Sequence, residues 1–140
     1  MDDVTFFRKV AGRLGCDAVR AEEVIFAIFQ ELRDRLTPKE ADDVAAQLPS
    51  TLKTLWEEGD RSDRTVAPTQ SVEFLAHVCA RSGLANGAAA ERAVKVVFGA
   101  LQELLGNRRG LHGESWDVFS QLPKSLKRLW LEAAEREVER

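Results

Sequence analysis

One ten-residue pattern occurs twice in this chain and decides its fold: QLPSTLKTLW covers Gln47–Trp56, and QLPKSLKRLW covers Gln121–Trp130. Seven of the ten columns are identical, and the two copies lie 74 residues apart. A repeat of this length within a chain of 140 residues indicates that a larger structural unit is repeated.

The proline in each copy predicts a corner between two helices. Proline lacks a backbone N–H, and it disfavours a helical conformation at the residue before it. Leu48 should therefore leave the helical conformation, and Pro49 should open a new helix at its first turn. Leu52, Leu55 and Trp56 then follow at helical spacing on one apolar face.

The residues before each corner also correspond between the two halves of the chain. The spacing of the matched residues grows from 68 to 72 to 74 along the chain, which places short insertions around residues 85–89 and 107–111. The matched residues are Phe6 with Phe74, Val10 with Val78, Gly15 with Gly83, and the stretch Gln30–Leu32 with Gln102–Leu104.

Local signals predict where the helices of the first half begin and end. Gly15 follows an apolar helical pattern and suits the position just after a helix, where the left-handed conformation is common. Thr37, Pro38 and Glu40 form a capping box with proline at the first helical position, so a short helix should start there and run to about Gln47.

Helical periodicity continues almost throughout, and no stretch alternates as a strand would. The sequence therefore predicts an all-α protein of about eight helices, built as a single domain from two four-helix repeats with pseudo-two-fold symmetry. We expect the first repeat at residues 1–58, a polar linker at 59–70, and the second repeat at 71–134.

Composition and charge narrow the class of protein. The chain is 44% hydrophobic and 31% charged with a net charge of −3, which is typical of a globular protein and makes nucleic acid an unlikely partner. No apolar run approaches the ~20 residues that span a bilayer, and the first residues lack the pattern of a signal peptide. We expect a cytoplasmic protein that does not contact a membrane.

The doubled pattern resembles a bacterial and archaeal family known as domain of unknown function 2267. The resemblance covers about residues 5–131, and the Gln-Leu-Pro corner with its following leucine and tryptophan is the most specific part. It implies a small, all-helical, intracellular protein. It implies no catalytic residue and no cofactor.

Several polar residues recur in both repeats and allow two interpretations. They could line two equivalent grooves that bind a ligand or partner, or they could be structural, with the glutamines satisfying backbone groups near the proline break and the lysines pairing with acids. The structural interpretation is favoured. The set is Gln47 and Gln121, Lys53 and Lys127, and Glu31 and Glu103.

An aromatic group in the second repeat has no counterpart in the first. Trp116 aligns with Asp42, and Phe119 aligns with Ala45. A tryptophan on a polar face is unusual, so this group is our candidate for contact with a partner; alternatively, Trp116 packs into the other half or covers a longer loop. The candidate contact residues are Trp116, Phe119, His112, Arg108 and Arg109.

The remaining reactive side chains indicate no site. His77 aligns with Lys9, so we expect it to be exposed and to have no metal or catalytic role. Cys16 and Cys79 lack the spacing of metal ligands and align with apolar residues. We therefore interpret them as small apolar side chains that fill space in the packing. We therefore expect that the protein has no metal site and no cofactor and that it is not an enzyme.

Three functional hypotheses follow. The first is a protein-interaction module or accessory subunit without catalysis, whose partner is another protein. The second is a small-ligand-binding protein with a pocket between the two repeats. The third is a nucleic-acid-associated regulator. The oligomeric state and the identity of a partner do not follow from the sequence.

Overall fold

The computed structural model describes residues 2–58, 71–105, 120, 122 and 124–138. All regular elements in these residues are helices, so the prediction of an all-α fold is confirmed. The prediction of an eighth helix and the predicted linker over 59–70 fall outside the described residues. The described helices are α1 (Asp3–Leu14), α2 (Ala18–Arg33), α3 (Pro38–Gln47), α4 (Ser50–Glu58), α5 (Ser71–Ser82), α6 (Gly87–Leu105) and α8 (Lys124–Val138).

Glycine ends the first helix of each half, as the sequence predicts. Gly15 and Gly83 have φ values of +71° and +73°, a region that glycine enters without steric cost. Their N–H groups donate to the carbonyl oxygens of Ala11 and Cys79, each at 2.8 Å. The two first helices therefore stop in the same way.

The corner between α3 and α4 follows the prediction closely. Thr37 accepts a hydrogen bond from the N–H of Glu40 at 3.2 Å, and α3 runs to Gln47. Leu48 is extended, with ψ of 140°. The carbonyl of Pro49 accepts the bond from the N–H of Lys53, so α4 begins at Ser50, one residue later than predicted.

The start of α4 is capped from a distant helix. The carboxylate of Asp3, in the first turn of α1, accepts the N–H groups of Thr51 at 3.3 Å and Leu52 at 2.9 Å. A proline corner leaves these N–H groups without an intrahelical acceptor. Since Asp3 lies 48 residues earlier than Thr51, no local pattern around the corner predicts this cap.

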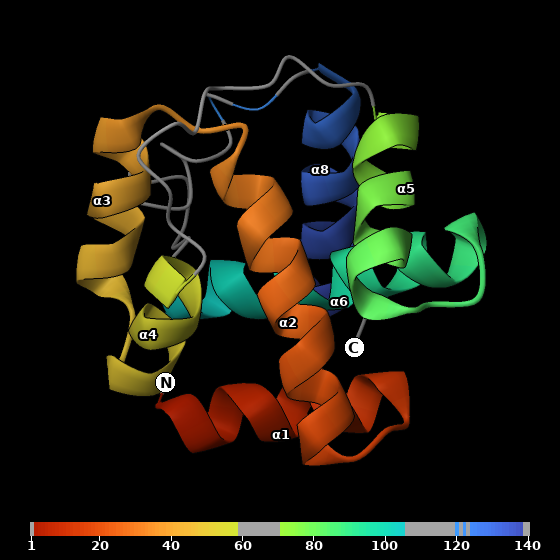
Figure 1. Cartoon of the computed structure of the whole chain (residues 1–140), viewed down its shortest axis with the longest axis horizontal. Coiled ribbons are helices and arrows are strands. Elements are labelled where there is room, and N and C mark those ends of the chain that lie inside the picture. The colour runs from red at the N-terminus through yellow and green to blue at the C-terminus, as the bar shows by residue number, and fades with distance from the viewer. Residues whose placement is uncertain (1, 59–70, 106–119, 121, 123, 139–140) are drawn as a thin grey trace.

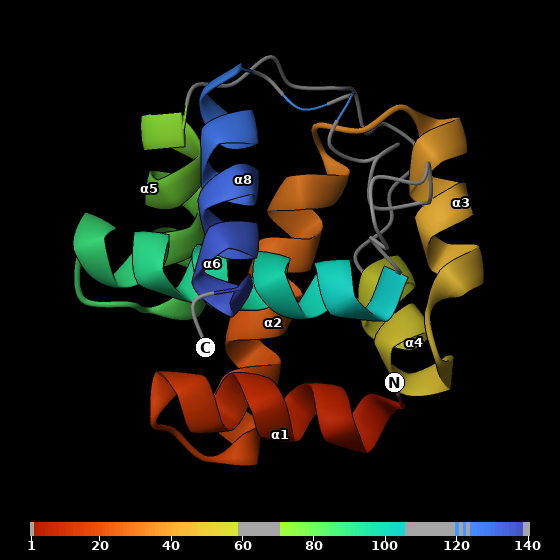
Figure 2. The ribbon, with the colours of Figure 1, turned by 180° about the vertical axis from the view of Figure 1, so that it is seen from behind.

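The two halves share one core. Helix α1 packs against both α2 and α6, and α5 packs against both α6 and α2, so each first helix contacts the long helices of both halves. Figure 1 shows α2 between α3 and α4 on one side and α5 and α8 on the other, with α1 across its lower end. In Figure 2, which shows the molecule from the other side, α6 crosses in front of α2.

Two arginines, one from the long helix of each half, donate hydrogen bonds to the end of the first helix of the other half. Arg20, in the first turns of α2, donates to the carbonyl of Ser82 at the end of α5. Arg92, in α6, donates to the carbonyl of Arg13 near the end of α1 at 2.6 Å. Cations suit helix C-termini, where main-chain carbonyls lack intrahelical donors.

Each half contains a row of three aromatic rings. In the first half, Phe6 lies 6.2 Å from Phe29, which lies 5.3 Å from Trp56. In the second half, the rings are Phe74, Phe98 and Trp130, at 6.2 Å and 4.9 Å. Phe6 and Phe29 are tilted by 54°, as are Phe74 and Phe98.

The contacts of the two long helices correspond at two different spacings. Phe29 corresponds to Phe98, and Asp17, which caps α2, corresponds to Asn86, which caps α6. Both pairs are 69 residues apart. Gln30 and Gln102 lie 72 apart, as expected, and donate to the carbonyls of Trp56 and Trp130, so the two spacings differ by almost one helical turn.

Truncation of Trp56 should strongly destabilise the protein. Its side chain is buried against Phe29, and its Nε1–H donates to the carbonyl of Ala41 at 3.0 Å. We expect Trp56→Ala to lower the free energy of unfolding by about 3–5 kcal/mol in urea denaturation. Leu131→Ala is the control, since Leu131 is 52% exposed. Equal effects of the two changes would contradict this packing.

Candidate functional site

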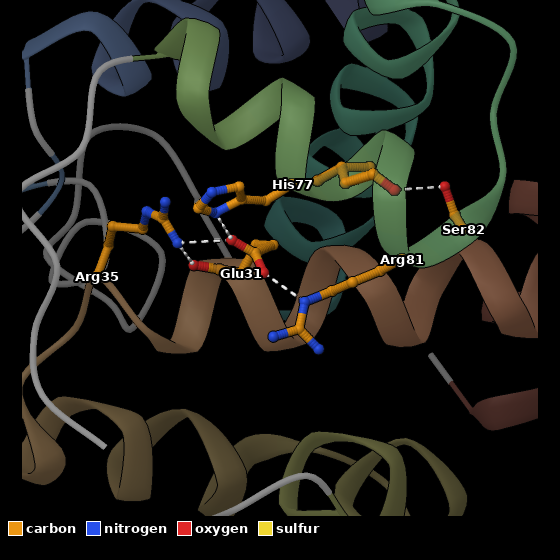
Figure 3. A network of polar contacts seen from close by, with 6 residues as sticks. Glu31, Arg35, His77, Arg81 and Ser82 are labelled. Carbon is orange, nitrogen blue, oxygen red and sulfur yellow. Dashed lines mark hydrogen bonds and ion pairs between the residues drawn. The ribbon is translucent and has the colours of Figure 1, made fainter. Parts of the chain in front are cut away.

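A buried carboxylate lies where α2 meets α5 (Figure 3). Glu31, on α2, is only 2% exposed. Its Oε1 atom lies 2.9 Å from Nη1 of Arg35 and 3.0 Å from Nδ1 of His77, and its Oε2 atom lies 2.5 Å from Nε of Arg81. We call these four residues the Glu31 cluster. A buried charge is costly without partners, and here three side chains supply them.

Arg35 forms the interior side of the Glu31 cluster. Its side chain is 1% exposed, and Nη1 also donates to the main-chain carbonyl of Glu31 at 2.9 Å. The guanidinium lies over the ring of Phe74, 5.1 Å from its centroid, in a cation–π contact. Its Nε and Nη2 atoms make no hydrogen bond within the described part of the chain. Arg35 thus links the end of α2 to α5.

His77 and Arg81 form the outer side of the Glu31 cluster. They are four residues apart on α5, a spacing that places them on one helix face. Their side chains are 58% and 40% exposed, so this side of the cluster is open to solvent. Our expectation that His77 is exposed is confirmed, but its bond to Glu31 was not foreseen.

The hydrogen bond to Glu31 determines which ring nitrogen of neutral His77 carries the proton. An ionised carboxylate can only accept hydrogen bonds, so Nδ1 of His77 must carry the proton in its contact with Glu31. The neutral ring then has its lone pair on Nε2. Figure 3 shows this second nitrogen on the side of the ring away from Glu31. The cluster can therefore present an oriented imidazole to solvent.

A second ion cluster joins α6 to α8. Lys95 lies 2.9 Å from Glu132 and 3.1 Å from Glu91, and Arg128 lies 3.0 Å from Glu132. The hydrogen bond from Lys95 is the main cause that lowers the pKa of Glu132 below its ordinary value of 4.5. The same bond raises the pKa of Lys95 above 10.5. Both shifts favour the charged pair.

Two buried glutamines, Gln30 and Gln102, have structural roles. The buried Gln30 donates to the carbonyls of Leu55 and Trp56, at 3.2 and 3.3 Å. The buried Gln102 donates to the carbonyl of Trp130 at 2.8 Å. Arg33 also donates to the carbonyl of Trp56, at 2.8 Å, so in the first half two side chains share the acceptor.

The polar residues expected to match do not share one environment. Glu103 pairs with Lys9 at 2.5 Å and is 31% exposed, whereas Glu31 is buried in its cluster. Gln47 and Lys53 are exposed, and Lys127 is half-buried on α8. Glu31 nevertheless pairs with His77 and Glu103 pairs with Lys9, the residue that aligns with His77, so the contact recurs in both halves and only its burial differs.

The candidate contact group lies outside the described residues, and only its counterparts can be located. Asp42, which aligns with Trp116, is exposed on α3. Ala45, which aligns with Phe119, is buried. The predicted residues that lie outside the described part are Arg108, Arg109, His112, Trp116, Phe119 and Gln121.

The sequence contained a partial signal for the Glu31 cluster. Glu31 with Arg35, and His77 with Arg81, are both pairs at the spacing of helical neighbours. The contact between the two pairs depends on the packing of α5 against α2, which no spacing reveals. No group of three or more His, Cys, Asp or Glu suited to a metal ion occurs in the described residues.

Neutralising Glu31 should lower the free energy of unfolding more than neutralising Glu103. Glu31→Gln leaves the buried Arg35 without its counter-charge, so we expect the free energy of unfolding to fall by about 3–5 kcal/mol. Glu103→Gln breaks an exposed pair with Lys9 and should cost less than about 1 kcal/mol. Urea denaturation of both variants measures the difference. Similar losses would show that the Glu31 cluster is not a buried ion pair in solution.

The contribution of Glu132 should depend on pH. Because its folded pKa is lowered, its stabilising effect is complete above pH 4.5 and is lost as the pH falls through the folded value. The difference in unfolding free energy between wild type and Glu132→Gln should therefore shrink in acid. Denaturation from about pH 7 to pH 3 measures it. A difference that stays constant would contradict the ion pair; the exposed Glu22, changed to Gln, is the control.

Comparisons with known proteins show which family the chain belongs to. No helix in the described part of the chain is both long enough and apolar enough to cross a membrane. No curated protein matches the chain. A family model described as an uncharacterized conserved protein matches residues 4–129, which include both proline corners. The chain therefore belongs to the family of uncharacterized conserved proteins called DUF2267.

Proposed function

We propose that the chain is an internal duplication of one four-helix unit. The matched ring rows, the left-handed glycines and the helix caps at Asp17 and Asn86 support this proposal. The two halves form one domain on this proposal, since α1 and α5 each pack against the long helices of both. Differences between the halves then locate features that are not needed by the fold itself.

We propose that the protein is a cytoplasmic interaction module or accessory subunit that performs no catalysis and binds another protein through Trp116. The observation that carries this proposal is the exposure of Asp42, the counterpart of Trp116. A tryptophan at a solvent-facing position contributes large apolar area, and tryptophan is enriched among the residues that dominate protein interfaces. His112 aligns with Pro38, which is also exposed.

The residues that align with Trp116 and Phe119 differ in burial, so we expect the two aromatic side chains to have different environments. Because Ala45 is buried, the position of Phe119 is expected to face the interior, whereas that of Trp116 faces outward. Arg108 and Arg109 fall in the insertion and have no counterpart. On this proposal Trp116 is the main contact, and the two arginines favour a partner with acidic groups.

The other two hypotheses receive less support. Of the bases available to a nucleic-acid regulator, Arg128 is paired with Glu132, and the net charge of the chain is −3. A ligand pocket between the halves would compete for space with side chains that are already fully buried there, including Phe6 and Phe74. Protein binding therefore remains our proposal.

The change Trp116→Ala tests this proposal in two measurements. If Trp116 contacts a partner, affinity for a co-purified protein should fall about 30-fold or more, which corresponds to about 2 kcal/mol for a dominant interface residue. The free energy of unfolding should stay within about 0.5 kcal/mol of wild type. Asp42→Ala is the control in the first half and should leave binding intact.

Two outcomes would overturn the proposal. A loss of about 3–5 kcal/mol in unfolding free energy would show that Trp116 packs in the core, as in the alternative interpretation. Equal binding by wild type and Trp116→Ala would exclude this residue as the contact.

A further inference from the structure

The imidazole of His77 combines exposure with a fixed orientation. Its Nδ1 atom is held 3.0 Å from the carboxylate of Glu31, which is buried in α2. The side chain is nevertheless 58% exposed, and its other nitrogen lies on the side of the ring away from Glu31 (Figure 3). A surface histidine is usually free to rotate. This one is fixed with Nε2 available to an incoming group.

The fixed hydrogen bond also sets the reactivity of the ring. Since Glu31 accepts the proton of Nδ1, the lone pair of the neutral imidazole is on Nε2, which makes that atom the nucleophile. A bond formed at Nε2 leaves a positive charge on the ring. The adjacent carboxylate is placed to stabilise that charge, as a carboxylate does for a catalytic imidazolium.

The surroundings of His77 suit an anionic group. Arg81 lies one turn later on α5 and uses Nε for Glu31, while its two terminal nitrogens point away from Glu31 (Figure 3). Together, Arg35 and Arg81 carry two positive charges against the single carboxylate of Glu31. Ala80, on the same face, is exposed and small, so access to the ring is not blocked. Glu73, one turn earlier, is the opposing negative charge on α5.

We propose that His77 is a phosphoryl acceptor, modified at Nε2 by a donor that holds its phosphoryl group in an acyl phosphate or phosphoramidate bond. The lone pair of Nε2 attacks phosphorus, and an Nε2–P bond forms as the bond from phosphorus to the donor oxygen or nitrogen breaks. The leaving group departs as a carboxylate, or as an amine that takes a proton from water. His77 keeps its Nδ1 proton, and Glu31 balances the charge of the ring.

This inference is independent of the contact proposed for Trp116. It concerns α2 and α5, both of which lie in the described part of the chain, and it makes the protein a recipient of phosphoryl groups and not a catalyst. Phosphorylation would add about 1.5 to 2 negative charges beside Arg81, which can form charge-assisted hydrogen bonds with them. The Glu31 cluster would then carry more negative charge where α5 packs against α2.

Phosphoramidate, a small phosphoryl donor, can test the proposal directly. The chain has two histidines, so His112→Asn leaves His77 as the only one. This variant is treated with potassium phosphoramidate at neutral pH, both folded and unfolded in urea. Phosphorus NMR at early times distinguishes Nε2 from Nδ1 phosphate, and mass spectrometry locates the site. A variant that also carries His77→Asn should give no phosphohistidine.

The folded protein should yield the Nε2 isomer alone, whereas the unfolded chain should yield both isomers. Glu31→Gln should react about five- to tenfold more slowly, because a hydrogen bond to a neutral amide stabilises the charged ring less than one to a carboxylate. Arg81→Gln, at a partly exposed position, should also slow the reaction. If Glu31→Gln does not fold, the isomer comparison and Arg81→Gln decide.

Three results would overturn the proposal. The first is a lack of phosphorylation of the folded protein. The second is the same mixture of isomers from the folded and unfolded chains, which would show that Glu31 does not orient the ring. The third is an unchanged rate in both folded variants, which would leave His77 as an ordinary exposed histidine beside a structural ion pair.

Discussion

The packing of one tryptophan on one phenylalanine holds each half together. Trp56 follows the proline corner, contacts the ring of Phe29 on α2, and donates its indole N–H to Ala41 on α3. It therefore joins three helices at one point. Trp130 contacts Phe98 in the second half in a similar way. Without Trp56 the first corner would keep the buried Leu52 and Leu55 but lose its largest apolar side chain, which covers the long helix.

The Glu31 cluster differs between the two halves in its burial. Glu103 forms the matching contact with Lys9 and is 31% exposed, whereas Glu31 is 2% exposed. The same kind of contact can therefore lie at the surface, so its position on the helix does not by itself require a buried carboxylate. Burial of Glu31 brings a desolvation cost that Arg35, Arg81 and His77 must offset. The bonds from His77 and Arg81 also join α5 to α2.

The sequence predicted the local features better than the long-range ones. Gly15, Thr37 and Leu48 each act through their own backbone neighbours, and the structure confirms all three. The cap from Asp3 onto α4 and the meeting of Glu31 with His77 depend on packing between helices far apart in the chain, and both were missed. The spacing between the two long helices is another long-range feature. The bonds of Gln30 and Gln102 agree with the expected spacing of 72, whereas the ring rows correspond at 69, which the sequence did not predict.

The position of the first helices has an evolutionary consequence. Because α1 packs on α6 as well as on α2, and α5 packs on α2 as well as on α6, each half uses a helix of the other to cover its long helix. On the proposed duplication, a single ancestral unit would have folded as a homodimer in which each first helix contacted both subunits, with stability that depended on concentration. Fusion through residues 59–70 would have replaced that association by an intramolecular one at high effective concentration. The two halves were then free to diverge, so that Glu31 became buried beside His77 while Glu103 stayed partly exposed beside Lys9.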